Sequence, residues 1–231
     1  MESQTRRKFL YGSAIATVGV VAPGALAWQQ KEGGQGQEAE VSPTEDLMRE
    51  HGLLNRVLLI YEESSRRLHG KADFDPKVLE DAAGIIRHFI EDYHEKLEED
   101  YLFPRFEKAG KLAELVKVLR EQHQAGRKLT ARIRELATAA AIKSQGDRQK
   151  LGAAIHAFIR MYRPHEARED TVLFPALHEI VSAHEYDSLG DEFEKKEHEL
   201  FGKEGFEGMV ERVTGLEKVL GIYNLAQFTP R

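Results

Sequence analysis

Side chains at alternating steps of four and three, most of them apolar, run from Leu47 to Leu68 and from Leu151 to Val172, the spacing that places them on one face of an α-helix. The first stretch begins at Ser42-Pro43-Thr44-Glu45, which combines an N-cap serine, a proline at the first helical position and the glutamate of a capping box. The pattern predicts helices from 42 to about 69, from Asp75-Pro76 to about Pro104, from about Leu112 to Lys143, and from about Asp147 past Val172.

Four long helices joined by short turns favour an all-α fold, an up-down four-helix bundle over residues 42–181. Composition agrees, because seven prolines in 231 residues are few enough to allow long helices. The absence of cysteine excludes a disulfide framework. Beyond Ser182 the chain to about Leu220 predicts one or two further amphipathic helices. Residues 182–231 are therefore expected to form a C-terminal helical extension outside the bundle.

The sequence repeats itself within the predicted bundle. HEKLEEDYLFP at 94–104 returns as HEAREDTVLFP at 165–175, and LMREH at 47–51 returns as LREQH at 119–123. Each half is thus a predicted helix pair with one early histidine, one later His-x-x-x-Glu and a Leu-Phe-Pro ending. Two such pairs are expected to pack about a pseudo-twofold axis.

The first 27 residues have the three features of an export signal peptide: a basic start, a short apolar run and small residues at the end, Ala25-Leu26-Ala27. Thr5-Arg6-Arg7-Lys8-Phe9-Leu10 resembles the twin-arginine signal, which predicts export through the twin-arginine machinery to the periplasm or beyond. The apolar run is shorter than the roughly 20 residues that span a bilayer, so no membrane attachment is expected after cleavage. Residues 28–41, rich in Gln, Gly and Glu, are interpreted as a flexible linker.

Candidate chemistry comes from histidines and glutamates on the predicted core faces. Residues four apart on a helix share a face, so His94 with Glu98 and His165 with Glu169 can each present two ligands to one point. His51 and His123 lie on the apolar stripes of the partner helices. The sequence therefore predicts a metal site formed by His51, His94, Glu98, His123, His165 and Glu169, because these groups would be costly to bury unpaired.

Imidazole and carboxylate ligands suit iron, manganese or zinc, and two bridging carboxylates suit a pair of ions. Six protein ligands do not saturate two octahedral ions, so open positions are expected. The net charge of −6, from 33 Lys+Arg and 39 Asp+Glu, offers no general attraction for nucleic acid, which is not expected as a partner.

These residues resemble the hemerythrin-like proteins, the HHE cation-binding domain, over about residues 44–180. The resemblance implies a four-helix bundle with a non-haem di-iron centre, in which Glu98 and Glu169 bridge the ions and the four histidines are terminal ligands. It also implies one of the roles of that family, which are binding of a small diatomic ligand (O₂ or NO), sensing of oxygen or iron, and repair of damaged iron centres.

The chain departs from the five-histidine oxygen carriers of that family and is more similar to a four-His, two-Glu subgroup. The residue four after His123 is Arg127 instead of histidine, which favours a more open and reactive site over stable O₂ carriage. The carriers take their last carboxylate from an Asp five residues after the fourth-helix histidine, which here is Asp170; Glu169 is preferred because it mirrors Glu98, and Asp170 stays an alternative. Glu95 and Glu166 follow ligand histidines in both halves and are either outer groups of the site or solvated charges.

Two functions are expected from different classes. The first is an exported di-iron protein that binds or reacts with O₂, NO or peroxide; the alternative is a metal-binding or metal- or oxygen-sensing module without turnover, and whether the chain is an enzyme is left open. A ferritin-like oxidase needs two Glu-x-x-His motifs and two more glutamates, but only Glu91-x-x-His94 is present, so it is rejected. The remaining six histidines lack a repeat partner and are not expected to be ligands.

Overall fold

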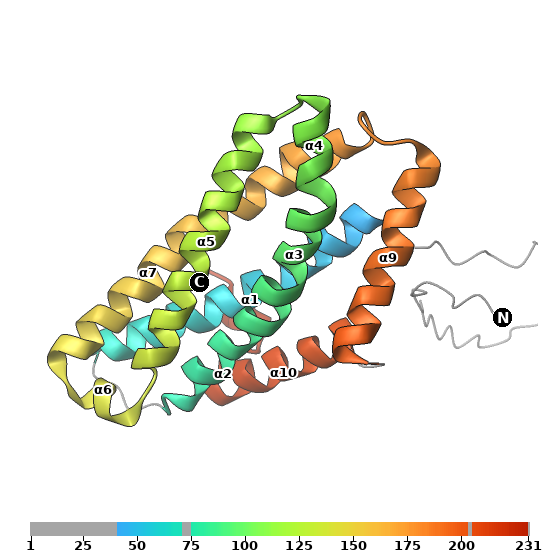
Figure 1. Ribbon diagram of the computed structural model, residues 1–231. Helices are drawn as coiled ribbons and strands as arrows, with labels where there is room; N and C mark the ends of the chain where they lie inside the picture. The colour runs from blue at the N-terminus through green and yellow to red at the C-terminus, as the bar shows by residue number, and fades with distance from the viewer. Residues whose placement is uncertain (1–40, 71–74, 203–204, 231) are drawn as a thin grey trace, which may run out of the picture.

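The structure is a computed structural model that describes residues 41–70, 75–202 and 205–230 (Figure 1). Every regular element in these ranges is a helix, and no strand occurs among them. The predicted all-α class is therefore confirmed. The predicted export signal at 1–27 and nearly all of the predicted linker at 28–41 lie outside the described residues.

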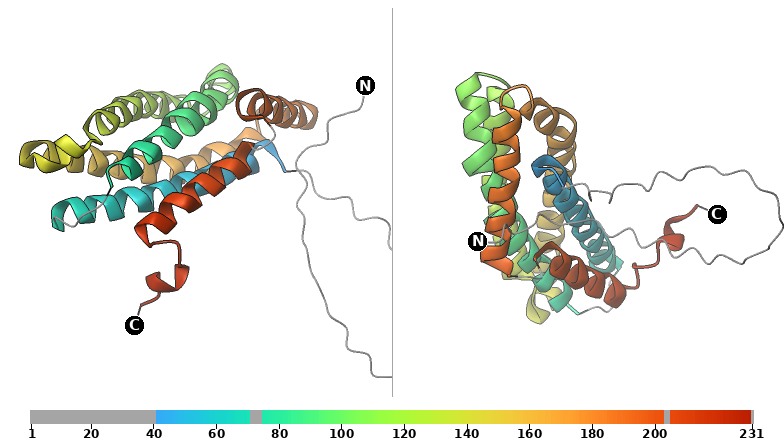
Figure 2. Two further views of the ribbon diagram at one scale, coloured as in Figure 1. Left: turned by 90° about the horizontal axis from the view of Figure 1, so that it is seen from below. Right: turned by 90° about the vertical axis from the view of Figure 1, so that its right-hand side faces the viewer.

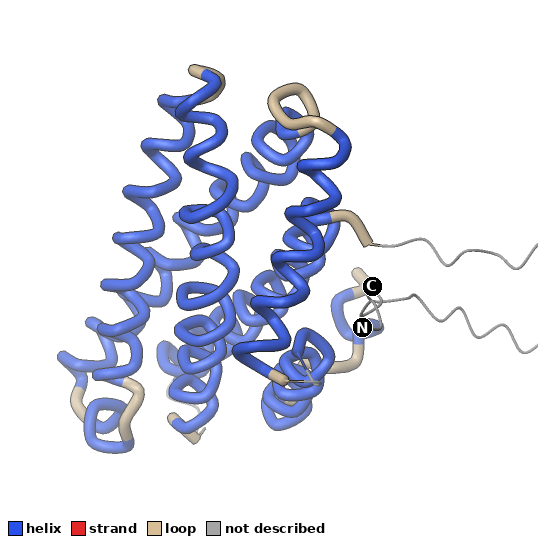
Figure 3. The backbone as a smooth tube through the Cα atoms, turned by 45° about the vertical axis from the view of Figure 1, so that its right-hand side comes forward, coloured by secondary structure: helices blue, strands red, loops and turns tan. Residues whose placement is uncertain are grey.

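Four helical columns form the bundle. They are α1 (Pro43–Gly70); α2 (Lys77–Ile85) with η1 (Ile86–His94), α3 (Glu95–Leu97), η2 (Glu98–Leu102) and α4 (Phe103–Ala109); α5 (Ala113–Leu136); and α7 (Gln145–Arg168) with η3 (Glu169–Leu173) and α8 (Phe174–Leu177). α1 contacts α2 and α7, and α5 contacts the same two helices, so the columns close a ring around one core. Residues 110–112 join the second column to α5, and such described connections are the tan segments of Figure 3.

The stripes read from the sequence form that core. On α1 the leucines at 47, 54, 58 and 68 are all buried, and Ile155 and Phe158 of α7 are fully buried opposite them. Burying one such side chain contributes about 1.5–3 kcal/mol. The bundle thus rests on the helical period that the sequence displays.

The second and fourth columns contain π-helical turns that the sequence pattern did not predict. η1 ends at His94, η2 begins at Glu98, and η3 begins at Glu169. π turns inside α-helices occur frequently at functional sites, because the wider turn shifts the side-chain register locally. Here η2 and η3 occupy the same position in the two sequence repeats.

The third predicted helix is wrong in one respect. Instead of one helix to Lys143, α5 ends at Leu136 and a short α6 follows (Ala139–Lys143). Thr138 takes an extended backbone conformation and its hydroxyl accepts a hydrogen bond from the Ala141 amide, so it caps a new helix. The competing local hydrogen bond of a threonine side chain ends the long helix.

The C-terminal helices cover one face of the bundle (Figure 2). α9 (Ala183–Phe201) begins after the N-cap Ser182 and contacts α1 and η1, whereas α10 (Gly205–Leu220) contacts α1 and α2. Arg56 of α1 forms a bidentate ion pair with Glu217 of α10, at 2.6 and 2.9 Å. The extension is therefore docked on the helix that carries the first histidine of the candidate site.

The last described residues leave the bundle surface. The 3₁₀ helix η4 (Leu225–Phe228) projects away from the bundle in Figure 2 and buries none of its residues. Leu225 is 80% exposed and Phe228 is 50% exposed. Across 41–70, 75–202 and 205–230, no helix has both the length and the apolar composition needed to cross a membrane.

Candidate metal centre

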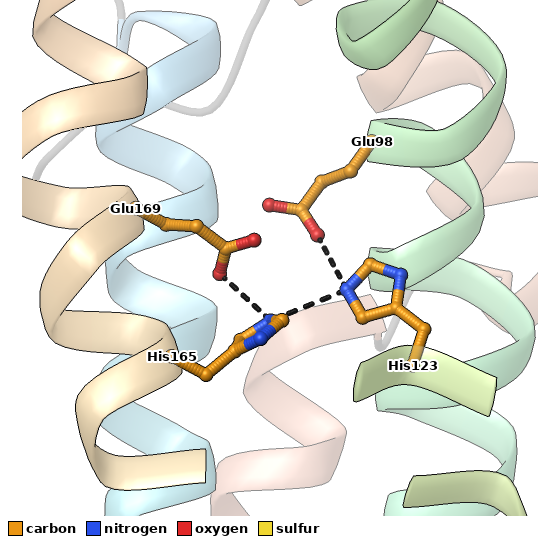
Figure 4. A group of neighbouring side chains, drawn as sticks. All are labelled: Glu98, His123, His165 and Glu169. Carbon is orange, nitrogen blue, oxygen red and sulfur yellow. Dashed lines mark hydrogen bonds and ion pairs between the residues drawn. The ribbon is translucent and has the colours of Figure 1, made fainter. Parts of the chain in front are cut away.

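The six residues predicted as ligands lie together in the middle of the bundle. His51 comes from α1, His94 and Glu98 from the second column, His123 from α5, and His165 and Glu169 from the fourth column. Every one of these side chains is at most 3% exposed. Figure 4 shows Glu98, His123, His165 and Glu169 pointing toward one another from three columns.

The imidazoles form two facing pairs. Nε2 of His51 lies 3.0 Å from Nε2 of His94, and Nε2 of His123 lies 3.2 Å from Nε2 of His165. Each pair joins the early histidine of one sequence repeat to the later histidine of the same repeat. The pseudo-twofold arrangement suggested by the repeat is therefore visible in the side chains.

Each glutamate lies between the two imidazole pairs. Oε2 of Glu98 is 3.9 Å from His94 Nε2 and 3.4 Å from His123 Nε2. Oε2 of Glu169 is 3.4 Å from Nε2 of His51 and 3.2 Å from Nε2 of His165. Because both carboxylates reach both pairs, the arrangement has the connectivity of two bridging ligands between two terminal pairs.

Oxygen acceptors fix the tautomer of the four histidines. Each Nδ1 faces the side-chain oxygen of another residue: His51 with Asp170 (2.7 Å), His94 with Glu50 (2.7 Å), His123 with Glu99 (3.1 Å) and His165 with Gln122 (2.9 Å). These oxygens only accept, so each Nδ1 carries the hydrogen and donates it. In a neutral ring the Nε2 lone pair is then directed into the cluster, which is how metal-binding histidines are normally oriented.

Three of these outer partners, Glu50, Glu99 and Gln122, were missed by the sequence reasoning. The repeat contains the signal, because Glu50 and Gln122 each precede an early histidine, whereas Glu99 and Asp170 each follow a later glutamate. Glu50 and Gln122 each accept a hydrogen bond from the later histidine of their own half, whereas Glu99 and Asp170 each accept one from the early histidine of the other half. Asp170, the alternative ligand, thus lies against an outward Nδ1 while Glu169 lies among the Nε2 atoms.

The Leu-Phe-Pro endings of the two repeats supply the apolar wall of the cluster. Phe174 stacks on the ring of His51 and Phe103 on the ring of His123, with ring centroids 5.5 Å apart in both cases. Each phenylalanine therefore contacts the early histidine of the other half. The repeated Leu-Phe-Pro motif thus packs against the imidazoles and excludes water from them.

A second polar layer lies beside the cluster. Tyr162 donates a 2.5 Å hydrogen bond to Glu95, and the guanidinium of Arg127 lies 2.8 Å from both Glu95 and Glu99. Burial raises the pKa of Glu95 to about 8, although the tyrosine and arginine oppose this shift. Adding a Cβ at Gly126 would place it 2.2 Å from the Tyr162 hydroxyl, so this glycine makes room for the tyrosine.

The other half has its own version of that layer. Glu166, which corresponds to Glu95, accepts a 2.5 Å hydrogen bond from Asn55, the residue four after His51. Burial raises the pKa of Glu166 to about 8. Both glutamates that follow ligand histidines are buried outer groups, so the interpretation of Glu95 and Glu166 as solvated charges is wrong.

Burial and mutual repulsion set the protonation of the metal-free cluster. Burial lowers the pKa of His94 well below its usual value. Burial also raises the pKa of Glu98 well above its usual value, and the negative charge of Glu169 adds to this rise. Burial also opposes a charge on His51, but the hydrogen bond to Asp170 and the nearby carboxylate of Glu169 together outweigh it and raise the pKa to about 10. The cluster therefore holds protons where a metal ion would place its positive charge.

The donor set fits a metal. All four carboxylate oxygens of Glu98 and Glu169 are buried and have no hydrogen-bond partner of normal geometry among the described residues. Leaving a buried, charged carboxylate without such partners costs several kcal/mol for each carboxylate. Glu98, His123, His165 and Glu169 place ligand atoms within 4.8 Å of one another, as do His51, His94 and Glu98, and this mixture of nitrogen and oxygen donors suits iron, manganese or zinc.

Comparison with known proteins identifies the family. The model of the hemerythrin HHE cation binding domain matches residues 42–177 and, in a second overlapping match, residues 115–228. The chain belongs to the hemerythrin HHE family. Two overlapping matches are consistent with the internal repeat of this hemerythrin-like chain, and the buried His/Glu cluster fits the cation-binding role in the family description.

Curated relatives of this hemerythrin-like chain come from mycobacteria. Proteins of Mycobacterium tuberculosis and Mycobacterium bovis are 48% identical to it over 231 residues, which cover 97% of this chain and 91% of each relative. They are named only as uncharacterized proteins. No solved structure matches the chain significantly.

Proposed function

We propose that the chain holds a non-haem di-iron centre, with His51 and His94 on one ion and His123 and His165 on the other. Glu98 and Glu169 bridge the two ions. The observation that carries this proposal is the position of each carboxylate between the two imidazole pairs, 3.2–3.9 Å from one Nε2 of each. Manganese or zinc are the alternatives that the same ligands accept.

The proposed activity is binding of O₂ or NO, or reaction with peroxide. Two iron ions held by six protein ligands supply open coordination positions and redox chemistry. The chain shields the centre from water, since the site residues are at most 3% exposed and Phe103 and Phe174 lie against the imidazoles. A low-polarity, water-poor surrounding favours an uncharged diatomic ligand over bulk solvent.

Arg127 favours reaction over reversible carriage. Its position is that of the additional histidine in the five-histidine carriers that the sequence resembles, and its guanidinium is engaged by Glu95 and Glu99. This feature supports the proposed assignment to the four-His, two-Glu subgroup. One position that the carriers close with an imidazole therefore stays open in the proposed centre.

The proposed compartment is outside the cytoplasm. The support is the sequence of residues 1–27, with Arg6-Arg7 in a twin-arginine pattern. That route carries folded proteins, which suits a chain without cysteines that gains no disulfide from export. Metal insertion before export is the proposed reason for the route.

A metal-binding or sensing module without turnover is the second candidate. Its support is the exposed apolar end of the described chain, Tyr223, Leu225 and Phe228, each at least half exposed. A segment of this kind is suited to contact with a partner protein. In this alternative the centre would change state without consuming its ligand.

The experiment uses the full chain purified without oxygen and loaded with Fe²⁺. Optical spectra are recorded before and after addition of O₂, NO or peroxide, followed by steady-state consumption of NO and peroxide, with His165→Ala as the control. New near-ultraviolet and visible bands with sustained consumption support the proposed activity. Bands without consumption favour the sensing module, and no bands in an iron-loaded protein contradict both.

A further inference from the structure

The two imidazole pairs differ in the groups behind them. In the first pair both Nδ1 atoms donate to carboxylates, His51 to Asp170 and His94 to Glu50, each at 2.7 Å. In the second pair His123 donates to a carboxylate at 3.1 Å, and His165 donates to the neutral amide oxygen of Gln122 at 2.9 Å. The sequence repeat therefore places an acid and an amide at corresponding positions, 50 and 122.

The carboxylate behind the second pair also lies against two cations. Glu99, the one carboxylate behind the second pair, lies 2.8 Å from Arg127 and 3.0 Å from Lys96. Its negative charge is thus shared with two cations. Glu50 is fully buried beside the carboxylates of Asp46 and Glu197, and a negative charge there acts on the neighbouring imidazole over a lower dielectric.

The physical consequence is a difference in donor strength. A carboxylate that accepts the Nδ1 hydrogen makes the Nε2 lone pair of the same ring more basic, and a neutral amide does so less. The same negative charge also favours a proton on Nε2. A dication carries one more positive charge than the proton that it displaces, so added negative charge still favours the metal.

We propose that the two metal positions are unequal, that the first divalent ion binds between His51 and His94, and that the Glu50/Gln122 difference sets this order. The inference rests on the dinuclear site proposed above. Glu50 acts here as a positioning residue behind His94. Outer partners of metal-bound histidines typically change metal affinity by about 10- to 100-fold, which sets the size of the expected effect.

The test is a calorimetric titration of the metal-free full chain with Co²⁺. Crystals grown with one equivalent of Co²⁺ locate the first ion by its anomalous scattering. We expect two binding steps separated by about tenfold or more, with the first ion at His51 and His94. Glu50→Gln should bring the two steps together, Gln122→Glu should strengthen the second step, and the double exchange should move the first ion to His123 and His165.

Gln124→Glu is the matched control, because it adds one charge at an exposed position two residues from Gln122. It should leave both steps unchanged. Two equal steps in the natural protein, or a first ion between His123 and His165, would overturn the inference. An unchanged separation in Glu50→Gln would overturn the role of Glu50.

The outcome also separates this inference from the proposed function. A total of two cobalt ions per chain with no preferred order would overturn only the inequality of the positions. A total of one ion per chain would overturn the dinuclear centre, and the inference with it.

Discussion

Two regions follow each other along the core of the bundle. Between the candidate metal centre and α6 the core is mainly apolar, with Ser64 and Thr130 as buried polar exceptions. Its fully buried apolar residues include Leu58, Ile86, Ile133, Ile155 and Phe158. At the centre itself the core consists of imidazoles and carboxylates that are buried just as deeply. Similar burial therefore encloses two very different kinds of side chain.

This difference between the two regions indicates which part of the core needs a bound metal for stability. Apolar side chains are stabilised by packing alone, and the rings of Phe158 and Tyr61 meet edge to face at 5.4 Å. Glu98 and Glu169 gain nothing comparable from packing, because their oxygens lack hydrogen-bond partners of normal geometry. A metal is therefore expected to stabilise one region and to leave the other unaffected.

The largest expected effect follows removal of a bridging carboxylate. Glu169→Ala takes one ligand from both proposed metal positions and should lose most of the bound metal. The bound metal also contributes to the free energy of unfolding, on the order of 10 kcal/mol for structural zinc, and this contribution should be lost with the metal. Metal content by mass spectrometry and urea unfolding measure the two losses.

Asp170→Ala is the comparison for that variant, since Asp170 accepts a hydrogen bond from the outer Nδ1 of His51. It should weaken metal binding by about 10- to 100-fold without abolishing it. The opposite ranking of the two variants would make Asp170 the bridging ligand.

A smaller loss is expected from His165→Ala, which removes a terminal ligand of one position only. At least one ion per chain should be lost, and the melting temperature should approach that of the chelator-treated protein. His156→Ala, on the exposed side of the same helix, should keep the full metal content. Equal metal content in both variants would contradict the assignment of His165.

The apolar region should respond differently. Phe158→Ala leaves a cavity and should lower the free energy of unfolding by about 3–5 kcal/mol. Because this region is expected not to depend on metal, urea unfolding should give the same loss in metal-loaded and metal-free protein. A loss confined to the metal-loaded form would show that the two regions are not separable.

The smallest effect is expected at the layer between them. Gly126→Ala forces the buried ring of Tyr162 to move and should cost about 1–3 kcal/mol, partly offset by the better helix propensity of alanine. Gly84→Ala, in α2, meets open space and should be neutral or stabilising by up to about 1 kcal/mol. Thermal unfolding of the two variants compares them; similar melting temperatures would show that Tyr162 is not tightly held.

The helices were readable from the sequence because their apolar faces repeat with the helical period, as Leu54 and Leu58 illustrate. The break at Thr138 was not readable, since one side-chain hydrogen bond decides it. The π turns at Glu98 and Glu169 were also missed. They depend on local backbone adjustments that no hydrophobic pattern records.

The candidate site was predicted in part. The histidines and glutamates stood out because ionisable groups on a core face need an explanation, and the structure brings all six together. Their role as ligands stays a prediction. Glu50 and Gln122 were missed because each acts through a hydrogen bond to a histidine on another helix, although the repeat aligns them.

The central claim is the pair of ions between Glu98 and Glu169. The most direct measurement is the iron content of protein purified without oxygen, combined with anomalous diffraction at the iron edge. We predict two irons per chain and two peaks, one beside His51 and His94 and one beside His123 and His165. A single peak, or ions bound away from these histidines in a folded chain, would contradict the account.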